Sequence, residues 1–192
     1  PAFLRVNIRK TTIEKAQKIL SGDGIQTVKH PSIITALRVT EGQNQIKNCM
    51  AYKDGFVEIQ DASSQASVID LPRDSNLKIL DYCCGSGGKS LALDAWTEGK
   101  IFAYDISPDR SFNLKTRAER SNAQITKISK PIKEMFDVIF CDVPCSGSGS
   151  WRRDPDGKWK LNAHSWQNLL NTQIEVINEA KQLLKTDGIL IY

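Results

Sequence analysis

The feature that most constrains the fold is a regular alternation of short apolar segments and helix-forming segments that begins at Leu77. The predicted strands are residues 78–81, 100–105, 124–129, 136–142 and 188–192. The predicted helices are residues 90–96, 108–120 and 161–184. Strands that alternate with helices build βαβ units, so this part of the chain predicts a doubly wound parallel sheet of the α/β class.

A smaller unit with a different pattern precedes this alternation. Residues 3–7 and 33–39 are predicted strands, and a capping box at Thr11–Glu14 predicts a helix that runs to Leu20. A further strand is predicted at residues 56–60, with a helix at 61–71 capped by Asp61 or Ser63. We therefore divide the chain into a small α+β module at residues 1–53 and a second domain at residues 54–192.

The two parts differ in charge. Residues 1–53 hold nine Lys and Arg against three Asp and Glu (9 − 3 = +6), whereas residues 54–192 hold 17 against 19 (17 − 19 = −2). A basic N-terminal third is typical of proteins that bind a polyanion, although an ordinary solvated surface has the same composition.

Composition excludes several classes of protein. The chain has 192 residues, 40% hydrophobic and 25% charged, which is ordinary for a globular domain. No apolar run approaches the ~20 residues that span a bilayer, so no membrane association is predicted. Five cysteines, an odd number, argue against a disulfide framework and favour a reducing compartment, the cytoplasm. Cys141 and Cys145 could form half of a zinc site, but adjacent Cys83 and Cys84 are poorly spaced for ligation, and we predict no metal.

A glycine-rich turn at residues 81–89 (DYCCGSGGK) connects the first predicted strand of the alternation to its helix. Glycines permit close backbone approach to a ligand, and the helix N-terminus offers free amides to a negative group. The spacing matches neither a P-loop nor a dinucleotide fingerprint. Asp105 ends the next strand, where a carboxylate accepts hydrogen bonds from ribose hydroxyls or caps a helix near Pro108. A tight structural turn, a nicotinamide cofactor and S-adenosylmethionine all remain open on these residues alone.

The segment at residues 142–159 leaves the fourth strand at its carboxyl end, where ligand sites of α/β sheets lie. Its Asp142-Val-Pro-Cys145 turn presents a carboxylate and a thiol. The cations that follow, among two tryptophans, are Arg152, Arg153 and Lys158. Cations interleaved with aromatic rings suit phosphates and splayed bases, although an ordinary charged loop is the alternative interpretation.

Two features are unusual for a whole fold of this kind. Only Lys130–Met135 joins the third and fourth predicted strands, where a parallel crossover needs about a dozen residues. The sequence also stops at Tyr192, in the fifth strand. We therefore expect that an internal loop and a C-terminal segment are missing.

Together these motifs resemble the RNA cytosine-5 methyltransferases of the bacterial Sun/RsmB kind. The resemblance covers most of the chain: residues 4–7 are similar to the Leu-Arg-x-Asn strand of that family's RNA-binding module, and residues 60–65 to its Gln-Asp-x-x-Ser-Gln helix. Residues 81–89 and 142–159 are similar to its first and fourth motifs, although Cys84-Gly85-Ser86 stands where the family more often has Ala-x-Pro. The resemblance implies a Rossmann-like methyltransferase sheet with a small N-terminal α+β RNA-binding module.

The resemblance also implies roles for individual residues. S-adenosylmethionine would be the methyl donor and RNA, ribosomal or transfer, the substrate of a monomer. The residues assigned to the cofactor are Cys83, Cys84, Gly85, Ser86, Gly87, Gly88, Lys89, Asp105, Arg110 and Asp142. The residues assigned to RNA are Arg5, Asn7, Arg152, Arg153 and Lys158. The residues assigned to catalysis are Cys145 and Asp142.

Carbon 5 of cytosine becomes nucleophilic when a thiolate adds to carbon 6, and a carboxylate such as Asp142 favours that addition. In the family the attacking thiol lies in a later Thr-Cys motif, beyond Tyr192 here, and the thiol matched by Cys145 assists product release. Attack by Cys145 itself is the other hypothesis. A fragment that binds cofactor and RNA without catalysis, an amino-group methyltransferase and a nicotinamide oxidoreductase are the rival interpretations.

Overall fold

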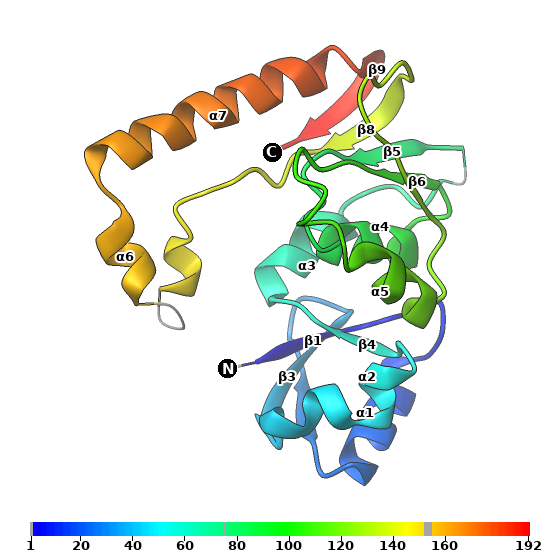
Figure 1. The fold of residues 1–192 in the computed structure, drawn as a ribbon. Helices are drawn as coiled ribbons and strands as arrows, with labels where there is room; N and C mark the ends of the chain where they lie inside the picture. Colours follow the sequence, from blue (N-terminus) through cyan, green and yellow to red (C-terminus); the bar gives the residue numbers. More distant parts are fainter. Residues whose placement is uncertain (1, 75, 152–154) are drawn as a thin grey trace.

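Two sheets, one antiparallel and one parallel, lie one above the other with helices between them (Figure 1). The computed structural model describes residues 2–74, 76–151 and 155–192. The N-terminal sheet has the order β2-β3-β1-β4, and its strands are β1 (Phe3–Val6), β2 (Gln26–Lys29), β3 (Ala36–Glu41) and β4 (Val57–Ile59). Its helices are α1 (Ile13–Gly22), the 3₁₀ helix η1 (Gln43–Asn48) and α2 (Met50–Lys53).

Strand β4 corrects the predicted domain boundary. It pairs antiparallel with β1, with Leu4 opposite Ile59, so the N-terminal sheet continues past residue 53. The helix predicted from Thr11 has Thr12 as its N-cap, whose hydroxyl accepts from the Lys15 amide, so an N-cap at Thr12 replaces the predicted capping box of Thr11 and Glu14. Strand β2 was not predicted, because its four residues contain a single apolar side chain and carry no alternating pattern.

The second sheet is parallel throughout, with the order β7-β6-β5-β8-β9, and it confirms the predicted α/β class. Its strands are β5 (Lys78–Asp81), β6 (Lys100–Ala103), β7 (Ile125–Lys127), β8 (Phe136–Phe140) and β9 (Leu184–Ile191). Its helices are α3 (Ala62–Ile69), α4 (Gly88–Trp96), α5 (Leu114–Ser121), the 3₁₀ helix η2 (Ser148–Ser150), α6 (Asp156–Lys160) and α7 (Ala163–Lys181). The predicted helix at 108–120 begins six residues late, at Leu114, because residues 108–113 form turns.

Alternate residues of the central strands supply two separate cores. Ile79 and Val138 pack with Leu93 of α4 on the face toward the N-terminal sheet. Leu80 and Ile139 pack with Ala180 of α7 on the opposite face. This period of two is the reason that the central strands are apolar at almost every position. Among the described helices, none has the length and apolar character to cross a membrane.

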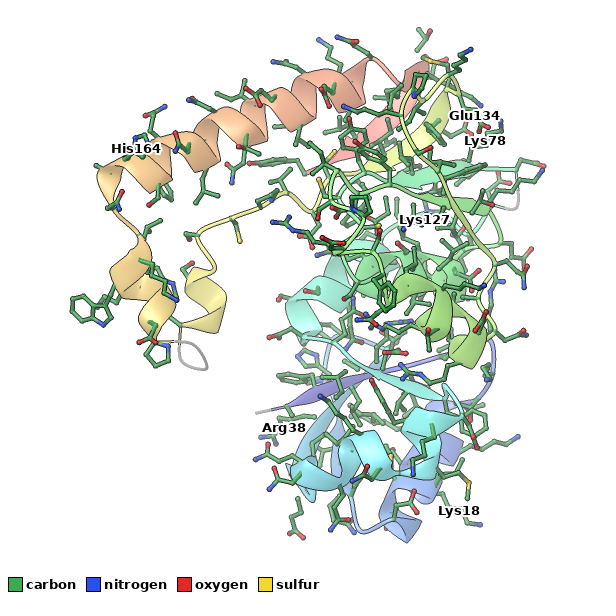
Figure 2. All side chains as sticks on the ribbon, in the orientation of Figure 1. Lys18, Arg38, Lys78, Lys127, Glu134 and His164 are labelled. Carbon is green, nitrogen blue, oxygen red and sulfur yellow. The ribbon has the colours of Figure 1, made fainter. Side chains whose placement is uncertain are left out.

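The connection from β7 to β8 forms with the residues that are present. It carries no helix. The expected missing loop at Lys130–Met135 stays a prediction. Nine peptide steps from Lys127 to Phe136 reach about 30 Å. Crossing three sheet spacings and returning along one short strand needs about 22 Å, so no helix is required. Ile132 packs on the sheet face, and Glu134 lies 3.7 Å from the Lys78 ammonium (Figure 2).

The interface between the two units is polar and buried, and it overturns two predicted RNA contacts. Arg5 is 4% exposed; its Nε donates to Gln60 (2.7 Å) and its Nη1 to the Leu91 carbonyl (3.1 Å). Burial lowers the pKa of Arg5 to about 10. Asn7 is 6% exposed and donates to the carbonyls of Gly55 (3.3 Å) and Ser121 (3.0 Å). Both side chains are buried and donate hydrogen bonds to acceptors within the protein, so neither is available to RNA.

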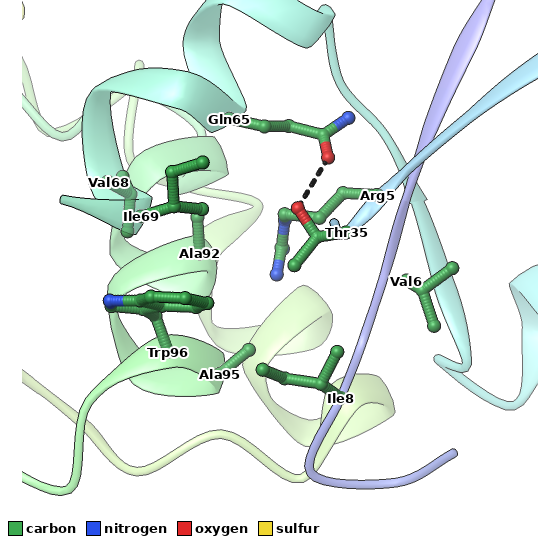
Figure 3. Close-up of a pocket in the computed structure, with 10 residues that line it drawn as sticks. All are labelled: Arg5, Val6, Ile8, Thr35, Gln65, Val68, Ile69, Ala92, Ala95 and Trp96. Carbon is green, nitrogen blue, oxygen red and sulfur yellow. Dashed lines mark hydrogen bonds between the residues drawn. The ribbon is translucent and has the colours of Figure 1, made fainter. Parts of the chain in front are cut away.

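Figure 3 shows the neighbourhood of Arg5, where a cavity of about 10 Å³ lies between α3, α4 and the N-terminal strands. The Thr35 hydroxyl donates to Gln65 at 2.9 Å across this junction, and Gln65 is fully buried. A cavity of this size holds about one water molecule. The junction is therefore closely packed, and its polar side chains pair both with one another and with backbone carbonyls.

Asn7→Ala is expected to lower the free energy of unfolding by about 1–3 kcal/mol, because it leaves two buried carbonyls without their donor. Arg38→Ala, on the exposed side of β3 (Figure 2), serves as the control and is expected to change it by no more than about 0.5 kcal/mol. Denaturant titration of both variants is the measurement. Equal effects would contradict the assignment of Asn7 to the interface.

Candidate active site

The carboxyl ends of β5, β6 and β8 meet around one cavity of about 200 Å³. Parallel pairing sets Asp81 beside Ala103 and Phe140, so the residues that follow each strand converge. Helix α7 closes the cavity from the other side with Glu175, Val176 and Glu179. The predicted cofactor residues that line it are Cys83, Gly85, Asp105, Arg110 and Asp142.

The glycine turn is shaped by backbone bonds and by two left-handed glycines. The Cys84 amide donates to the Tyr104 carbonyl (2.9 Å), and the Gly87 amide donates to the Cys84 carbonyl (2.8 Å). Gly87 has φ +85°, and a Cβ there would lie 2.2 Å from Leu114. Gly85 has φ +48°, and a Cβ there would meet nothing within 4 Å. At Gly87 the turn therefore packs too closely against Leu114 to admit a side chain. At Gly85 the absence of a side chain leaves the backbone accessible from the cavity.

The other predicted cofactor residues support the turn from outside the cavity lining. The Cys84 side chain is buried against Ala103 and Leu114. The Gly88 carbonyl accepts from Gln60 (3.2 Å), which ties the start of α4 to the N-terminal unit. Ser86 accepts two hydrogen bonds from Arg117, and Lys89 points to Asp142.

Asp105 uses both carboxylate oxygens within the protein. Its Oδ2 accepts from the Gly85 amide (2.8 Å) and its Oδ1 from the Ser107 amide (2.9 Å). Because α5 begins only at Leu114, the alternative role of Asp105 as the cap of a helix near Pro108 is wrong. Asp105 instead holds the glycine turn and the β6 exit together at the cavity wall.

Asp142 stands between two hollows. Its carboxylate is 55% exposed and lies 2.5 Å from the Lys89 ammonium, which is 14% exposed. On one side is the cavity, and on the other is a cleft lined by the serines of α3 (Ser63, Ser64 and Ser67) together with Lys89 and Tyr192. The ion pair with Lys89 fixes the direction of the carboxylate at the boundary of the two.

The cysteines at this edge differ in reactivity. Burial raises the pKa of Cys83, Cys84 and Cys141 to about 12, so these thiols stay protonated at neutral pH. Cys145 is exposed, and all five cysteines are free. Across residues 2–74, 76–151 and 155–192 no cluster of three His, Cys, Asp or Glu side chains could hold a metal.

A model of the family described as 16S rRNA methyltransferase RsmB/F matches residues 68–192, more than half of the chain. The chain belongs to the RsmB/F family.

Individual RsmB/F relatives agree with this match. Ribosomal RNA small subunit methyltransferase B of Vibrio cholerae is 30% identical over 201 residues, covering 100% of this chain and 46% of the relative. The chain thus spans about half the length of the curated relatives it matches. The crystal structure of PH0851 gives a TM-score of 0.91 at 26% identity, covering 98% of this chain and 45% of that one. NSun6 from Pyrococcus horikoshii with SFG gives 0.84 at 14% identity (98% and 74%), which shows the shared fold. Family membership indicates S-adenosylmethionine as the cofactor.

Sequence reasoning missed a network that joins α7 of this RsmB/F chain to the cavity wall. Tyr82 donates through its hydroxyl to Glu179 (2.6 Å), and the Lys130 ammonium donates to the same carboxylate oxygen (2.6 Å). Lys130 also lies 5.7 Å from the centre of the Tyr104 ring. Tyr82 and Lys130 lie 97 and 49 residues before Glu179 in the sequence, so no local motif signals their contact.

Three RNA-binding residues were predicted after the fourth strand. Two of them, Arg152 and Arg153, lie outside the described residues. Lys158 is exposed on α6, with its ammonium 5.4 Å from the centre of the Trp159 ring, and Trp159 is 80% exposed. Helix α6 hangs from the outer end of α7, near His164 and away from the sheets (Figures 1 and 2).

Asp81 is a second group that sequence reasoning left without a role. It is fully buried; the Ser90 hydroxyl donates to one oxygen (2.6 Å), and the other oxygen has no partner among the described residues. Burial, with a smaller contribution from Asp142, raises the pKa of Asp81 to about 7. The neutral acid is therefore the form that the fold prefers below that pH.

The folded RsmB/F chain is expected to lose stability between about pH 4 and pH 7 because of Asp81. A carboxyl whose pKa is raised by folding contributes fully below its unfolded pKa, and the contribution is lost as pH rises through the folded value. Asp81→Asn is expected to flatten the dependence in this window. Denaturant unfolding from pH 4 to pH 8 measures it; parallel profiles for both proteins would contradict the burial of an acid.

Proposed function

We propose that this protein transfers a methyl group from S-adenosylmethionine to carbon 5 of a cytosine in 16S ribosomal RNA. The observation that carries the proposal is the Asp142–Cys145 turn at the carboxyl edge of the sheet. It brings Asp142 and Pro144 to the wall of a cavity that also receives the glycine turn and Asp105, and the exposed Cys145 follows directly in the chain. Family membership supports the methyl-transfer class and the RNA substrate.

The residues at the cavity fit S-adenosylmethionine. Gly85 leaves room where a side chain would stand, and the Asp105 carboxylate lies beside it for the ribose hydroxyls. Cys83 and Arg110 complete the wall near these groups. When bound, the cofactor supplies a methyl group on a positively charged sulfur. The related fold of NSun6 was solved with SFG, which agrees with a ligand site in this fold.

Asp142 is positioned to act on the base. A carboxylate held by Lys89 at the border of the cavity and the α3 cleft accepts hydrogen bonds from the amino edge of cytosine. The bond orients the base so that carbon 6 faces the thiolate, and a proton shared with ring nitrogen 3 takes up the electron pair that addition moves into the ring. The cleft beside α3 is then the entry for the target base, which must be unstacked to reach it.

The proposed reaction regenerates the enzyme thiolate. A thiolate adds through sulfur to carbon 6, carbon 5 gains an electron pair and takes the methyl group, its proton passes to a base, and the carbon–sulfur bond breaks to return the thiolate. We assign Cys145 to product release, in line with its position in the fourth motif. The attacking thiol then comes from the later Thr-Cys motif of the full-length protein.

Cys145→Ala in the full-length protein is expected to trap a covalent RNA adduct while abolishing turnover. A denaturing gel with labelled 16S RNA and S-adenosylmethionine detects the adduct, and nucleoside mass spectrometry identifies the product. Cys49→Ala, in the N-terminal core, is the control and is expected to methylate normally. Loss of both adduct and turnover would instead make Cys145 the nucleophile. Methylation of an exocyclic amine by the unmodified protein would overturn the proposal itself.

Trp159→Ala is expected to weaken RNA binding by about 1–3 kcal/mol, because an exposed indole beside Lys158 is a platform for an unstacked base. Lys158→Ala is expected to reduce the slope of log affinity against log salt by about 1. Lys115→Ala, with an exposed side chain on α5, is the control; Figure 1 shows α5 and α6 on opposite sides of the view. Fluorescence anisotropy at several salt concentrations measures all three; unchanged affinity in the Trp159 variant would remove α6 from the RNA surface.

A further inference from the structure

Arg117 on α5 connects the glycine turn to the N-terminal unit. Its Nη1 donates to the Ser86 carbonyl (2.7 Å) and hydroxyl (2.9 Å), and its Nη2 donates to Glu58 Oε2 (2.9 Å). Glu58 lies on β4 and its side chain is 2% exposed, while that of Arg117 is 18% exposed. One guanidinium therefore links the glycine turn to strand β4 of the N-terminal sheet.

Arg120 is a matched control for Arg117, because it contacts the same carboxylate but not the glycine turn. It donates to the second oxygen of Glu58 and stacks over the Tyr52 ring at 4.0 Å. Its side chain is as buried as that of Arg117, at 20% exposed, and it carries the same charge against the same carboxylate. The contacts of Arg120 stay within the interface, whereas those of Arg117 reach Ser86.

The glycine turn needs such support because its glycine-rich sequence does little to fix its backbone conformation. Two of its glycines have positive φ, and glycines lose more conformational freedom on ordering than other residues. The sheet side of the turn is fixed through the Cys84 and Gly85 amides. Ser86, at its exposed tip, is fixed by Arg117 from the opposite side.

We propose that Arg117 is a positioning residue for the cofactor, and that Glu58 makes the N-terminal unit part of the cofactor site. Arg117 holds Ser86 so that the neighbouring Gly85 backbone stays open to the cavity before the ligand arrives. A turn fixed in advance spares the ligand the entropy of ordering it, so affinity depends on the bridge. The inference rests on the proposed use of S-adenosylmethionine at this cavity.

Calorimetric titration of S-adenosylmethionine into the full-length protein and its Arg117→Gln and Arg120→Gln variants tests the proposal. Arg117→Gln is expected to raise the Kd roughly tenfold, the scale of lost charge-assisted hydrogen bonds. Arg120→Gln is expected to lower stability similarly and to leave the Kd within about twofold. In turnover, Arg117→Gln is expected to raise KM for S-adenosylmethionine while kcat and KM for RNA stay unchanged.

The outcomes separate the two proposals. Failure of the unmodified protein to bind S-adenosylmethionine would overturn the proposed function. Binding by that protein together with equal Kd values for both glutamine variants would overturn the role of Arg117 alone. If Arg117→Gln does not fold, Arg117→Lys decides, because an ammonium keeps the charge but cannot span both partners. A raised Kd in Arg117→Lys supports the bridge, and an unchanged Kd overturns it.

Discussion

Parallel pairing of β5 with β6 and β8 is the constraint on which the rest of the structure depends. It places Asp81, Ala103 and Phe140 in register, so the segments that leave these strands meet at one edge. The glycine turn, Asp105 and the Asp142–Cys145 turn are far apart in sequence, and none of them forms a site alone. Shared register turns three local motifs into one cavity wall, as expected for α/β sheets.

The second constraint is that the two units are joined by charged and polar groups. Arg5, Asn7, Glu58 and Gln65 are all nearly or fully buried at the junction, and each is hydrogen-bonded to the opposite unit or to a neighbour there. Breaking one partner of such a set is costly because a buried charge or amide is left unpaired. Separating the units would therefore leave each of these buried groups without its partner, and the glycine turn is attached to the junction through Arg117.

The sequence was sufficient for the parallel sheet, because strand alternation is a local pattern. The motifs and strand ends also pointed to the strand side of the cavity wall, Cys83, Gly85, Asp105, Arg110 and Asp142, but not to the side that α7 supplies. The resemblance to the family's Leu-Arg-x-Asn strand assigned Arg5 and Asn7 to RNA, because a sequence motif does not show the packing that buries both side chains at the junction. The expectation of a longer crossover before β8 rests on a helix being the usual connection, and it stays a prediction, although nine peptide steps are long enough to span the distance. Arg117 and Glu179 were missed for a simpler reason: their partners are dozens of residues away, and a single Arg or Glu on a helix is most often solvated.

The cavity wall carries more negative than positive charge, and this bears on what it binds. Asp105, Asp142, Glu175 and Glu179 line it, against the single cation Arg110 among the described lining residues. Lys89 and Lys130 pair with Asp142 and Glu179 at its borders, and Asp81 beneath it is held toward the neutral form. Carboxylates focused on a small hollow favour a ligand with a positive centre. At the proposed cofactor site, a sulfonium would have that centre only until its methyl group is transferred, so this field would hold the sulfonium more strongly than the neutral thioether of the product.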